Sequence, residues 1–422
     1  MWWSFIFDVN AMKKSPTFLI FLTVFIDLLG FGIVLPLLPY YAHQEPFNAS
    51  EWQIGMLVAS YSLMQFIFAP IWGRVSDRVG RRPIILLSLM GSTVSYLIFG
   101  LAQTMWMLFL ARMLAGIGAA NIPTAQAYIA DTTTPENRAK GMGMIGAAFG
   151  LGFIFGPAVG GFLSHWGYSV PGFVAAGICF ADFALTYFLL PESLKEKGVS
   201  RPARHAARWS MITEAFSRPF VGTLLILFFI ATFALANMEA TFALLSKVRY
   251  HYTEAQTGYI FAYMGLLTTL VQGGMIRPLV RKLGEHKLIV IGTLVFAMSL
   301  LLLPYTPNFW TLAAALALLS FGQGVNTPSI TSLISQYSSA DEQGSILGVT
   351  QSLSSLARVV GPMWGGVMFD IGFQWPYLTA AGFMFVAFLL SLKNQAQARS
   401  MPALAINAPP EPVGQKQSSL HP

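Results

Sequence analysis

The chain has 422 residues, of which 55% are hydrophobic and only 10% are charged, and its formal net charge at pH 7 is +7. A soluble protein cannot hide so much apolar surface, and ordinary soluble proteins carry roughly 25% charged residues. The composition therefore predicts a membrane protein, in which the positive charge sets topology and does not bind nucleic acid. The single cysteine, Cys179, lies in an apolar run, which excludes disulfides and cysteine metal sites.

The first residues, Met1–Asn10, are apolar and lack both the cationic start and the small-residue cleavage site of a signal peptide. Met12 is followed by two lysines and would itself make a normal start. We therefore expect residues 1–11 to be an extension ahead of that start or a frayed terminus.

Apolar runs long enough to cross about 30 Å of hydrocarbon, which takes about 20 helical residues, recur along the chain. We expect an all-α membrane protein with twelve transmembrane helices in two pseudo-symmetric six-helix halves. Several runs exceed a perpendicular span, which implies tilt or protrusion beyond the bilayer. The expected spans are 17–41, 52–72, 83–101, 105–130, 139–164, 169–191, 219–247, 254–276, 286–304, 307–335, 344–369 and 374–393.

Lysine and arginine are distributed unevenly between the two sets of loops. With twelve spans both termini lie on one side, and the loops on that side carry most of the 25 lysines and arginines. The opposite loops carry only Lys247 and Arg249, while Arg112 and Arg358 fall inside spans. Because cytoplasmic loops are enriched in these residues, we expect both termini in the cytoplasm and the chain in the cell inner membrane.

The longest polar connection is rich in Arg, Lys and Pro and separates the two halves. The polar C-terminal tail contains Pro-Pro and Gln/Ser, a composition typical of disorder. The expected parts are a cytoplasmic segment 1–16, the halves 17–191 and 219–393, the linker 192–218 and a disordered cytoplasmic tail 394–422.

The two halves repeat one another in sequence. Random apolar sequence would not keep one offset over several helices. A repeat in the same membrane sense is typical of a transporter whose halves are related by an axis along the membrane normal. The matching pairs are Gly156-Pro157 with Gly361-Pro362, Gly160-Gly161 with Gly365-Gly366, Gly167 with Gly372, Pro171 with Pro376 and Pro123 with Pro328.

The loop Gly73–Pro83, between the second and third spans, packs four arginines and one aspartate into a chain with few charges. Its second copy, Arg277–Lys287, keeps the basic residues but has Arg281 in place of Asp77. Positive charge alone explains the topological role of the second loop. The acid of the first loop is not needed for topology, so Asp77 has a separate role.

Four segments resemble signatures of the major facilitator superfamily. They are Gly73–Pro83, Leu110–Gly118 in the fourth span, Gly152–Gly161 in the fifth span, which is similar to an antiporter motif, and Asp27–Pro39 in the first span. The last is similar to the first helix of the twelve-helix drug/proton antiporters, particularly the tetracycline-exporter-like branch. The resemblance implies a major facilitator fold whose halves rock around a mid-membrane site.

The resemblance also assigns roles within two segments. Asp77 would hold the start of the eleventh span and so stabilise the outward-open state, because the N-terminal amides of a helix favour an anion. The expected latch residues are Gly73, Asp77, Arg78, Gly80, Arg81 and Arg82. The fifth-span residues, expected to form a rocking interface, are Gly152, Gly156, Pro157, Gly160 and Gly161.

Ionisable residues inside the spans are the candidates for proton coupling, since a charge in the membrane is costly and functional by default. Asp27 lies about mid-membrane, and Arg112 is its expected partner because the first and fourth helices meet at the central cavity in this family. The alternative is a purely structural ion pair. Glu239 is expected to face the cavity, with an interfacial position as the alternative. Asp182 is expected to be structural, and Arg358 to pair with an acid or with helix-end carbonyls.

Polar and aromatic side chains on the cavity-lining spans form a further set. Together they predict an amphipathic, mostly apolar pocket with few charges. For each residue alone, a helix–helix hydrogen bond is the alternative role. The set is Phe31, Tyr61, Gln65, Asn121, Gln126, Asn237, Gln272, Gln323, Asn326, Gln351 and Arg358.

The chain departs from the tetracycline exporters of this branch, which carry further membrane acids in the third and ninth helices. The corresponding positions hold Ser95 and Phe296, so recognition of a metal-chelated tetracycline is not expected. No Gly-x-x-x-x-Gly-Lys-[Ser/Thr] segment occurs, which argues against ATP as the energy source. The few histidines are unclustered, which argues against a metal site.

These observations predict a secondary active transporter, not an enzyme, that exports a lipophilic or amphipathic drug-like compound in exchange for protons. One alternative is proton-coupled transport of a sugar, siderophore or other metabolite in the same fold. A less favoured alternative is a membrane receptor that does not transport. The expected partners are a small-molecule substrate, protons and the lipid bilayer; the chain is expected to be a monomer without a cofactor other than the proton gradient.

Asp77→Asn tests the separate role of the acid in the first basic loop. We expect the variant to reach the membrane, because the arginines that set topology remain, and to transport at a sharply reduced rate. Membrane abundance by immunoblot and transport in the same cells measure the two effects. Transport at the wild-type rate would rule out a latch at this position.

Overall fold

A computed structural model describes residues 15–194, 216–338 and 343–400. Within these residues the chain is helical and contains no β-strand. Eleven of the described helices are long and apolar enough to cross a membrane, and a further helix of 29 residues, α17 (Gln343–Ile371), packs beside them. The predicted all-α membrane fold is confirmed.

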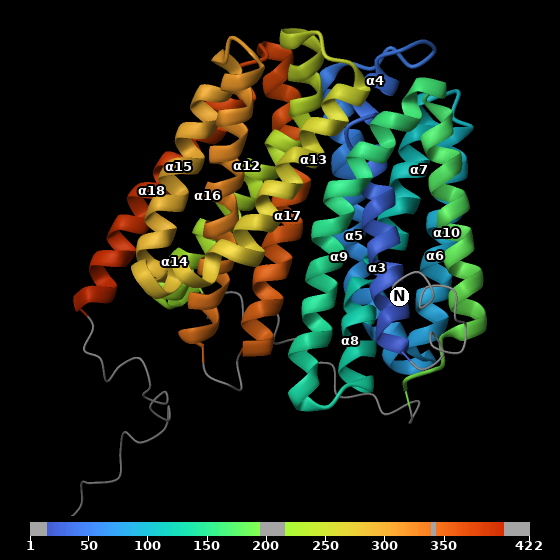
Figure 1. The fold of residues 1–422 in the computed structure, drawn as a ribbon, viewed down its shortest axis with the longest axis horizontal. Helices are drawn as coiled ribbons and strands as arrows, with labels where there is room; N and C mark the ends of the chain where they lie inside the picture. Colours follow the sequence, from blue (N-terminus) through green and yellow to red (C-terminus); the bar gives the residue numbers. More distant parts are fainter. Residues whose placement is uncertain (1–14, 195–215, 339–342, 401–422) are drawn as a thin grey trace, which may run out of the picture.

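The described helices fall into two groups that stand side by side in Figure 1. The first group is α3 (Pro16–Val34), α4 (Leu38–Ala42), α5 (Glu51–Val79), α6 (Arg81–Gly100), α7 (Met105–Gly118), α8 (Ile122–Thr132), α9 (Pro135–Leu163) and α10 (Ser169–Leu189). The second group is α12 (Pro219–Tyr250), α13 (Glu254–Leu270), α14 (Ile276–Leu283), α15 (Glu285–Leu302), α16 (Phe309–Gln336), α17 and α18 (Trp375–Ser400).

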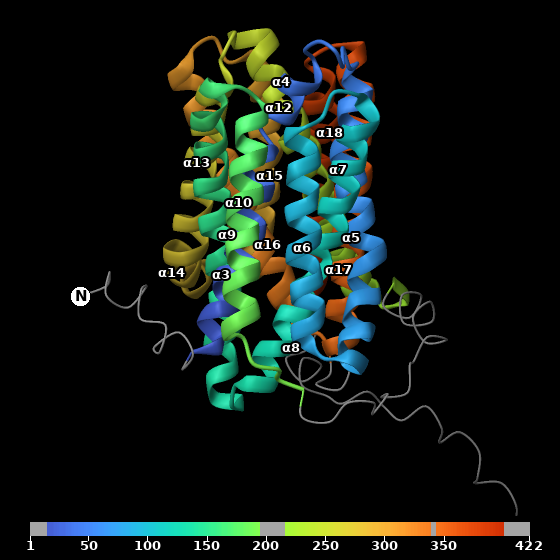
Figure 2. The same ribbon diagram turned by 90° about the vertical axis from the view of Figure 1, so that its right-hand side faces the viewer.

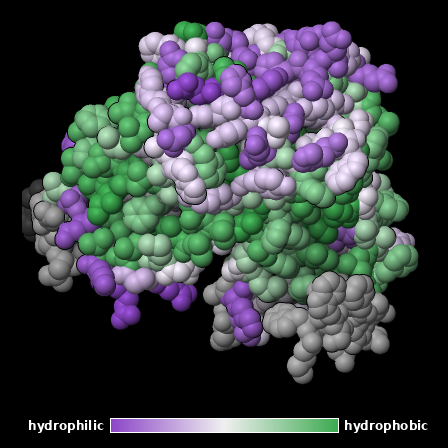
Figure 3. All heavy atoms as spheres, turned by 45° about the horizontal axis from the view of Figure 1, so that its top comes forward, coloured by the Kyte–Doolittle hydropathy of each residue, from purple (hydrophilic) through white to green (hydrophobic). Residues whose placement is uncertain are grey.

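The bundle has two ends, which are named here by features that they carry. The α4 end holds α4 and lies at the top of Figures 1 and 2. The Gly80 end is opposite and holds the turn between α5 and α6, at Gly80, and the turn between α14 and α15, at Gly284. Both glycines have positive φ, +116° and +76°, which residues with a side chain rarely adopt. They let the chain reverse between α5 and α6 and between α14 and α15 with hardly any loop. Figure 3 shows the hydrophobic side chains gathered in a band between hydrophilic regions, as a bilayer requires.

Local interactions repeat between the halves, which confirms the predicted pseudo-symmetry. Helices α5 and α13 both begin with a capping box, formed by Ser50 with Gln53 and by Thr253 with Gln256. The third and fourth spans, and likewise the ninth and tenth, are joined by equivalent serine hydrogen bonds. These run from Ser95 Oγ to the Ala111 carbonyl, 2.8 Å, and from Ser299 Oγ to the Ala315 carbonyl, 2.8 Å.

Three spans differ from the predicted ones because of local backbone chemistry. The first span ends at Val34, ahead of Pro36, and the separate helix α4 begins at Leu38 within the rest of the predicted span. The fourth is interrupted by the 3₁₀ turn η1 (Ala119–Asn121) before Pro123. The eighth contains the π-helical turn η3 (Val271–Met275) before Pro278.

The C-terminal tail begins later than predicted. Helix α18 continues to Ser400, so the prediction of disorder from residue 394 is wrong for residues 394–400. Glutamine and alanine in this stretch favour helix, and the side-chain amide of Asn394 donates to the Phe220 carbonyl at 3.3 Å. The predicted segment 1–11, most of the linker and the end of the tail lie outside the described residues.

The halves meet at the α4 end through backbones that approach very closely. A Cβ added to Gly161 of α9 would lie 2.9 Å from the Ala255 Cα of α13. A Cβ added to Gly258 of α13 would collide with the carbonyl oxygen of Pro157 on α9. Only glycine permits this spacing, so α9 and α13 form one closed contact between the halves.

The second contact between the halves is the pseudo-symmetric copy of the first. A Cβ on Gly366 of α17 would lie 2.9 Å from the Trp52 Cα of α5, and one on Gly55 of α5 would collide with the Pro362 carbonyl. The same residue types therefore close both seams at the α4 end.

The Gly80 end is open between the halves. The buried residues of α5 run from Ile54 to Ser62, and only Ser76 is buried beyond them. Helix α13 is buried mainly near its start, and α14 has no buried residue. The glycines toward this end at which an added Cβ would meet nothing within 4 Å include Gly143, Gly146, Gly273, Gly274 and Gly348.

Gly258→Ala tests the closed α4 end. The added methyl group has no room against Pro157, and overpacking costs about 1–3 kcal/mol. We therefore expect the population open at the α4 end to rise, by about tenfold for each 1.4 kcal/mol. The measurement is the distance distribution between spin labels at exposed Trp166 and Tyr305, in a Cys179→Ser background.

Gly177→Ala is the matched control, because nothing lies within 4 Å of the Cβ that it adds on the exposed face of α10. We expect it to leave the distance distribution unchanged. If Gly258→Ala also left the distribution unchanged, the close contact between α9 and α13 would not control the α4 end.

Candidate functional site

Asp27 lies in the middle of α3 and is buried, with 6% of its surface exposed. Its carboxylate accepts a hydrogen bond of 2.7 Å from the Asn121 side-chain amide and a longer one of 3.5 Å from the Ser92 hydroxyl. Asn121 is placed by the η1 turn in the fourth span, and Ser92 by α6. Both donors are neutral, so no cation among the described residues pairs with this acid.

Arg112 of α7 is the largest of the fully buried side chains and is 1% exposed. Its guanidinium lies over two aromatic rings, 4.6 Å from the centroid of Tyr61 and 5.8 Å from that of Phe31. Such contacts contribute about 0.5–2 kcal/mol each. The predicted ion pair with Asp27 is not formed in the described residues of this state. Nε and Nη2 of Arg112 have no hydrogen-bond partner, so the cation is available to an anion.

Glu239 of α12 pairs with Arg358 of α17 across 3.7 Å, which gives Arg358 an acidic partner of the kind predicted. Their side chains are 14% and 33% exposed, so the pair lies at the edge of the buried region. Arg358 is near enough for its charge to act on Tyr61 in the other half. The structure therefore brings the ion pair of the second half close to the Arg112 cluster of the first half.

The polar residues of the predicted cavity set separate into three groups. Asn237 and Gln65 make helix–helix hydrogen bonds, to the carbonyls of Pro376 at 2.7 Å and Ala119 at 3.1 Å. Asn326 is fully buried, and neither of its side-chain polar atoms has a partner. The glutamines are more accessible: Gln323 is half-buried, while Gln126, Gln272 and Gln351 are exposed. A role for these residues in substrate binding stays a prediction.

The antiporter-type segment of α9 presents two different faces. A Cβ on Gly152, Gly156 or Gly160 would press against α3, the nearest carbon atoms being 2.6 to 2.9 Å away. Gly161 and the carbonyl of Pro157 instead face α13 of the other half, while the ring of Pro157 lies against Gly32 of α3. One helix thus links the helix that carries Asp27 to the seam that closes the α4 end.

Arg81 is the centre of the basic loop at the Gly80 end and is 8% exposed. It forms ion pairs with Asp77 at 2.5 Å and with Asp131 at the end of α8 at 3.1 Å. It also donates to the Ser76 hydroxyl at 2.7 Å. This cluster holds α5, α6 and α8 together within one half.

Glu192, just after α10, also belongs to this cluster and was not among the predicted site residues. Its carboxylate accepts from the backbone N–H groups of Arg81 at 2.9 Å and Arg82 at 3.3 Å, at the start of α6. A Cβ at Gly80 would collide with this carboxylate, so the glycine makes room for it. The sequence contained one signal for this contact, because Glu192 is an acid that directly follows Pro191 at the end of an apolar span. Helix N-termini favour anions, so such an acid is a candidate to cap a neighbouring helix.

The Asp77 side chain is 57% exposed and forms an ion pair with Arg81 of its own half. The side chains at the start of α17, which the predicted latch would contact, lie outside the described residues. An added Cβ at Gly73 would meet nothing within 4 Å, and Arg78 is exposed. Arg82 donates to the Tyr187 carbonyl at 2.6 Å and so holds the loop on α10. The role of Asp77 between the halves stays a prediction.

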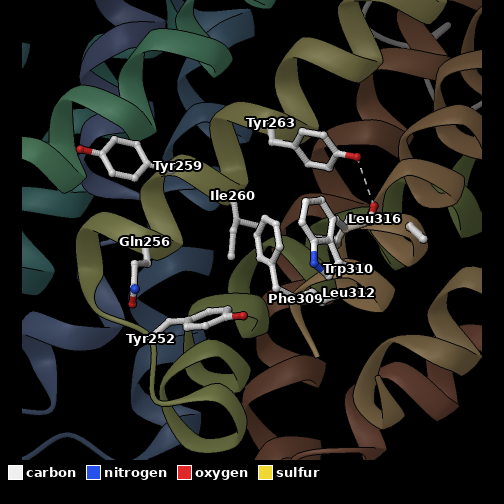
Figure 4. A pocket seen from close by; sticks show the side chains of 11 residues that line it. Tyr252, Gln256, Tyr259, Ile260, Tyr263, Phe309, Trp310, Leu312 and Leu316 are labelled. Carbon is white, nitrogen blue, oxygen red and sulfur yellow. Dashed lines mark hydrogen bonds between the residues drawn. The ribbon is translucent and has the colours of Figure 1, made fainter. Parts of the chain in front are cut away.

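An aromatic groove of about 660 Å³ lies at the α4 end between α13 and α16 (Figure 4). Tyr252, Tyr259, Phe309 and Trp310 line it, and Trp310 is 79% exposed. All of its lining residues belong to the second half. Tyrosine and tryptophan at the ends of membrane helices are typical of the bilayer interface. The groove is therefore part of the outer surface and separate from Asp27 and Arg112.

Two pseudo-symmetric halves, closed at one end and open at the other around buried charges, define a membrane transporter. The model of the Major Facilitator Superfamily matches residues 20–278 and 274–416. The chain belongs to the major facilitator superfamily, and it is a transporter and not an enzyme. The resemblance inferred from its sequence motifs is confirmed.

Similar proteins include drug-resistance proteins. The chain is 34% identical to the tetracycline resistance protein, class E, of Escherichia coli, over 87% of this chain and 92% of that protein. It is 30% identical to multidrug resistance protein 2 of Bacillus subtilis (strain 168), over 92% of this chain and all of that protein.

Solved structures show the same fold. The human organic anion transporter MFSD10 (TETRAN) has a TM-score of 0.66 and 27% identity, covering 90% of this chain and 99% of that one. A bacterial homolog of the human lysosomal transporter Spinster, in an inward-facing and unoccupied conformation, has a TM-score of 0.74 and 15% identity, covering 93% and 99%.

Glu192→Ala tests the cap on α6. Loss of a carboxylate that accepts from N-terminal amides costs about 0.5–2 kcal/mol, so we expect a lower Tm for the purified protein in detergent. Glu45→Ala, which removes an exposed acid from the loop after α4, is the control and should keep the wild-type Tm. Equal Tm values for the two variants would show that Glu192 does not stabilise the cluster.

Proposed function

We propose that the protein exports a lipophilic or amphipathic compound in exchange for protons by alternating access. The Gly80 end carries Arg74, Arg78, Arg81 and Arg82, whereas the expected opposite loops carry only Lys247 and Arg249. The positive-inside rule therefore assigns the Gly80 end to the cytoplasm. On this assignment the state described above is open to the cytoplasm, and the α4 end is closed toward the outside.

The observation that carries the proposal is Asp27. It is a buried carboxylate in the middle of a membrane helix, and among the described residues its hydrogen-bond donors are the neutral side chains of Asn121 and Ser92. An acid with this environment can lose and regain a proton without breaking an ion pair, and a charge at this depth is costly unless it has a use. Asp27 is on this proposal the group that carries the proton.

Arg112 and the Glu239–Arg358 pair supply the charge that couples the two halves. Arg112 is held by the rings of Tyr61 and Phe31 and keeps unpartnered donors. It can bind the carboxylate of Asp27 after deprotonation or an acidic group of the substrate, but not both at once. Competition between Asp27 and the substrate for one cation would couple export of the substrate to uptake of the proton.

We infer an amphipathic substrate because the region around Asp27 and Arg112 has few charges and is aromatic and mostly apolar. Names of similar proteins point the same way, since they refer to tetracycline resistance, multidrug resistance and organic anion transport. Ser95 and Phe296 stand where we expected acids in tetracycline exporters. We therefore propose an amphipathic organic compound that binds without a chelated metal.

We further propose that the protein works as a monomer in the cell inner membrane, with both termini in the cytoplasm. It would use the proton gradient as its energy source and no bound cofactor. The start of α3 and the end of α18 lie at the same end of the bundle, which supports this topology (Figure 1).

Asp27→Asn tests the proton-carrying role. The purified protein is placed in liposomes with a pH-sensitive dye, and tetracycline, ethidium, an amphipathic organic anion and a neutral sugar are supplied as probes. We expect one of the amphipathic probes to move protons with the wild-type protein, and no proton movement above background with Asp27→Asn. The asparagine has nearly the same shape but cannot take up a proton.

Glu45→Gln is the matched control, because it makes the same chemical change in an exposed loop and should transport like the wild type. Proton-coupled transport by Asp27→Asn would contradict the assignment. A wild-type response to the sugar alone would favour a metabolite transporter, and no response to any probe under any gradient would favour a receptor.

A further inference from the structure

Asp182 of α10 is a second carboxylate inside the first half, and the proposed function does not use it. Only 2% of its surface is exposed. Neither Oδ1 nor Oδ2 has a hydrogen-bond partner, and no ion pair of the described residues includes it. A buried carboxylate is normally paired or hydrogen-bonded, because an unpaired charge costs several kcal/mol. Its protonation is therefore not fixed by a permanent partner.

Two threonine hydroxyls face this carboxyl group, Thr23 of α3 and Thr186 of α10. Both side chains are at most 1% exposed, and both hydroxyl oxygens also lack a hydrogen-bond partner. A hydroxyl can turn to donate or accept, so it suits a carboxyl group that alternates between its two protonation states. Three unpartnered polar side chains thus meet where α10 packs against α3.

The helical register arranges these groups in a row with Asp27. Thr23 precedes Asp27 by four residues, one turn of α3, so both lie on the same face, about 6 Å apart along the axis. Thr186 follows Asp182 by one turn, toward the end of α10 that leads to Glu192 and the Gly80 end. The row therefore leads from the middle of the bundle toward the Gly80 end.

The other ionisable groups around Asp182 come from each neighbouring helix. Asp27 on α3 acts on it through its charge. Cys179 lies one turn away on α10, and Tyr96 of α6 faces that cysteine. Arg112 acts on Tyr96 and not directly on Asp182. Two carboxyl groups that share one apolar region repel each other when both are charged, so their protonation states are linked.

We propose that Asp182 is a second proton-binding site, joined to Asp27 through the hydroxyl of Thr23. In the transfer step the Asp27 carboxyl gives its proton to the Thr23 oxygen while the Thr23 hydroxyl gives its own proton to Asp182. One proton moves and no net charge is created on the threonine. Asp182 then releases the proton past Thr186 toward the Gly80 end.

This inference rests on the proposed function for its use in transport, but proton binding at Asp182 is tested without any substrate. Infrared spectra of the purified protein in lipid are recorded from acidic to alkaline pH, in water and in heavy water. A protonated buried carboxyl group gives a carbonyl band above the amide region. We expect a titrating band with more than one component in the wild type, reduced by about half in Asp182→Asn, since coupled acids titrate as a pair.

Three variants make the test specific. Asp27→Asn should remove the other component. Glu45→Gln should leave both components unchanged, because the carboxyl group of exposed Glu45 is hydrogen-bonded to water and absorbs at a lower frequency than a buried one. Thr23→Val keeps both carboxyl groups but removes the hydroxyl that joins them. We therefore expect both carboxyl bands to titrate, each independently of the other. Asp182→Glu restores a carboxyl group and should restore a shifted band, which separates proton binding from a folding defect.

Two results would overturn the proposal. One is a titrating band in Asp182→Asn that equals that of the wild type, because Asp182 would then not change its protonation. The other is a loss from the Asp182→Asn spectrum that is constant at every pH, which would make Asp182 a permanently protonated structural acid. If the Asp182 component titrates while Asp27→Asn still couples transport to protons, proton binding at Asp182 stands and the proton-carrying role proposed for Asp27 fails.

Discussion

The strictest constraint on this structure is the short distance between the helix backbones where the two halves touch. At Gly258 and Gly55 there is no room for even one methyl group, because the carbonyls of Pro157 and Pro362 already fill the space. Contacts this tight cannot form at both ends of two rigid halves at once. The closed α4 end therefore implies the open Gly80 end, with the exposed glutamines and the loosely packed second half of α5.

The second constraint is the cost of charge inside a membrane. Three buried ionisable groups are stabilised in different ways. Asp27 accepts hydrogen bonds from neutral donors, Arg112 lies over aromatic rings, and Glu239 pairs with Arg358. Asp182 has none of these partners in the described residues. Groups held by weak or neutral partners can change state when the halves move, whereas a strong ion pair would resist the change. Asp27, Arg112 and Asp182 thus have no ion pair among the described residues, whereas Glu239 is held by Arg358.

Much of the fold could be predicted from the sequence, because a bilayer leaves few alternatives. The lengths of the apolar runs predicted the spans, and the constant offset between matching residues predicted the repeat. Breaks within spans were harder: Pro36 and Pro123 are visible in the sequence, but a proline can bend a helix or end it, and Pro328 lies inside the unbroken α16. Neighbouring packing decides between these outcomes.

The site was less predictable, because it depends on which face each residue presents. Asp27 and Arg112 were singled out correctly as buried residues, but their partners were not. The η1 turn rotates Asn121 toward Asp27, and Arg112 lies on aromatic rings from α3 and α5. The cap made by Glu192 joins residues more than a hundred positions apart. Spacing along one helix cannot reveal such contacts, since they arise only after the helices pack.

The most direct test of the account is whether the two ends open alternately. Spin labels at Trp166 and Tyr305 report on the α4 end, and labels at exposed Asn137 and Lys282 report on the Gly80 end. Both distances are measured in liposomes with a pH gradient and a transported probe. We expect a second population in which the Gly80-end distance shortens while the α4-end distance lengthens. Lengthening of both distances together, or no change in either during transport, would contradict it.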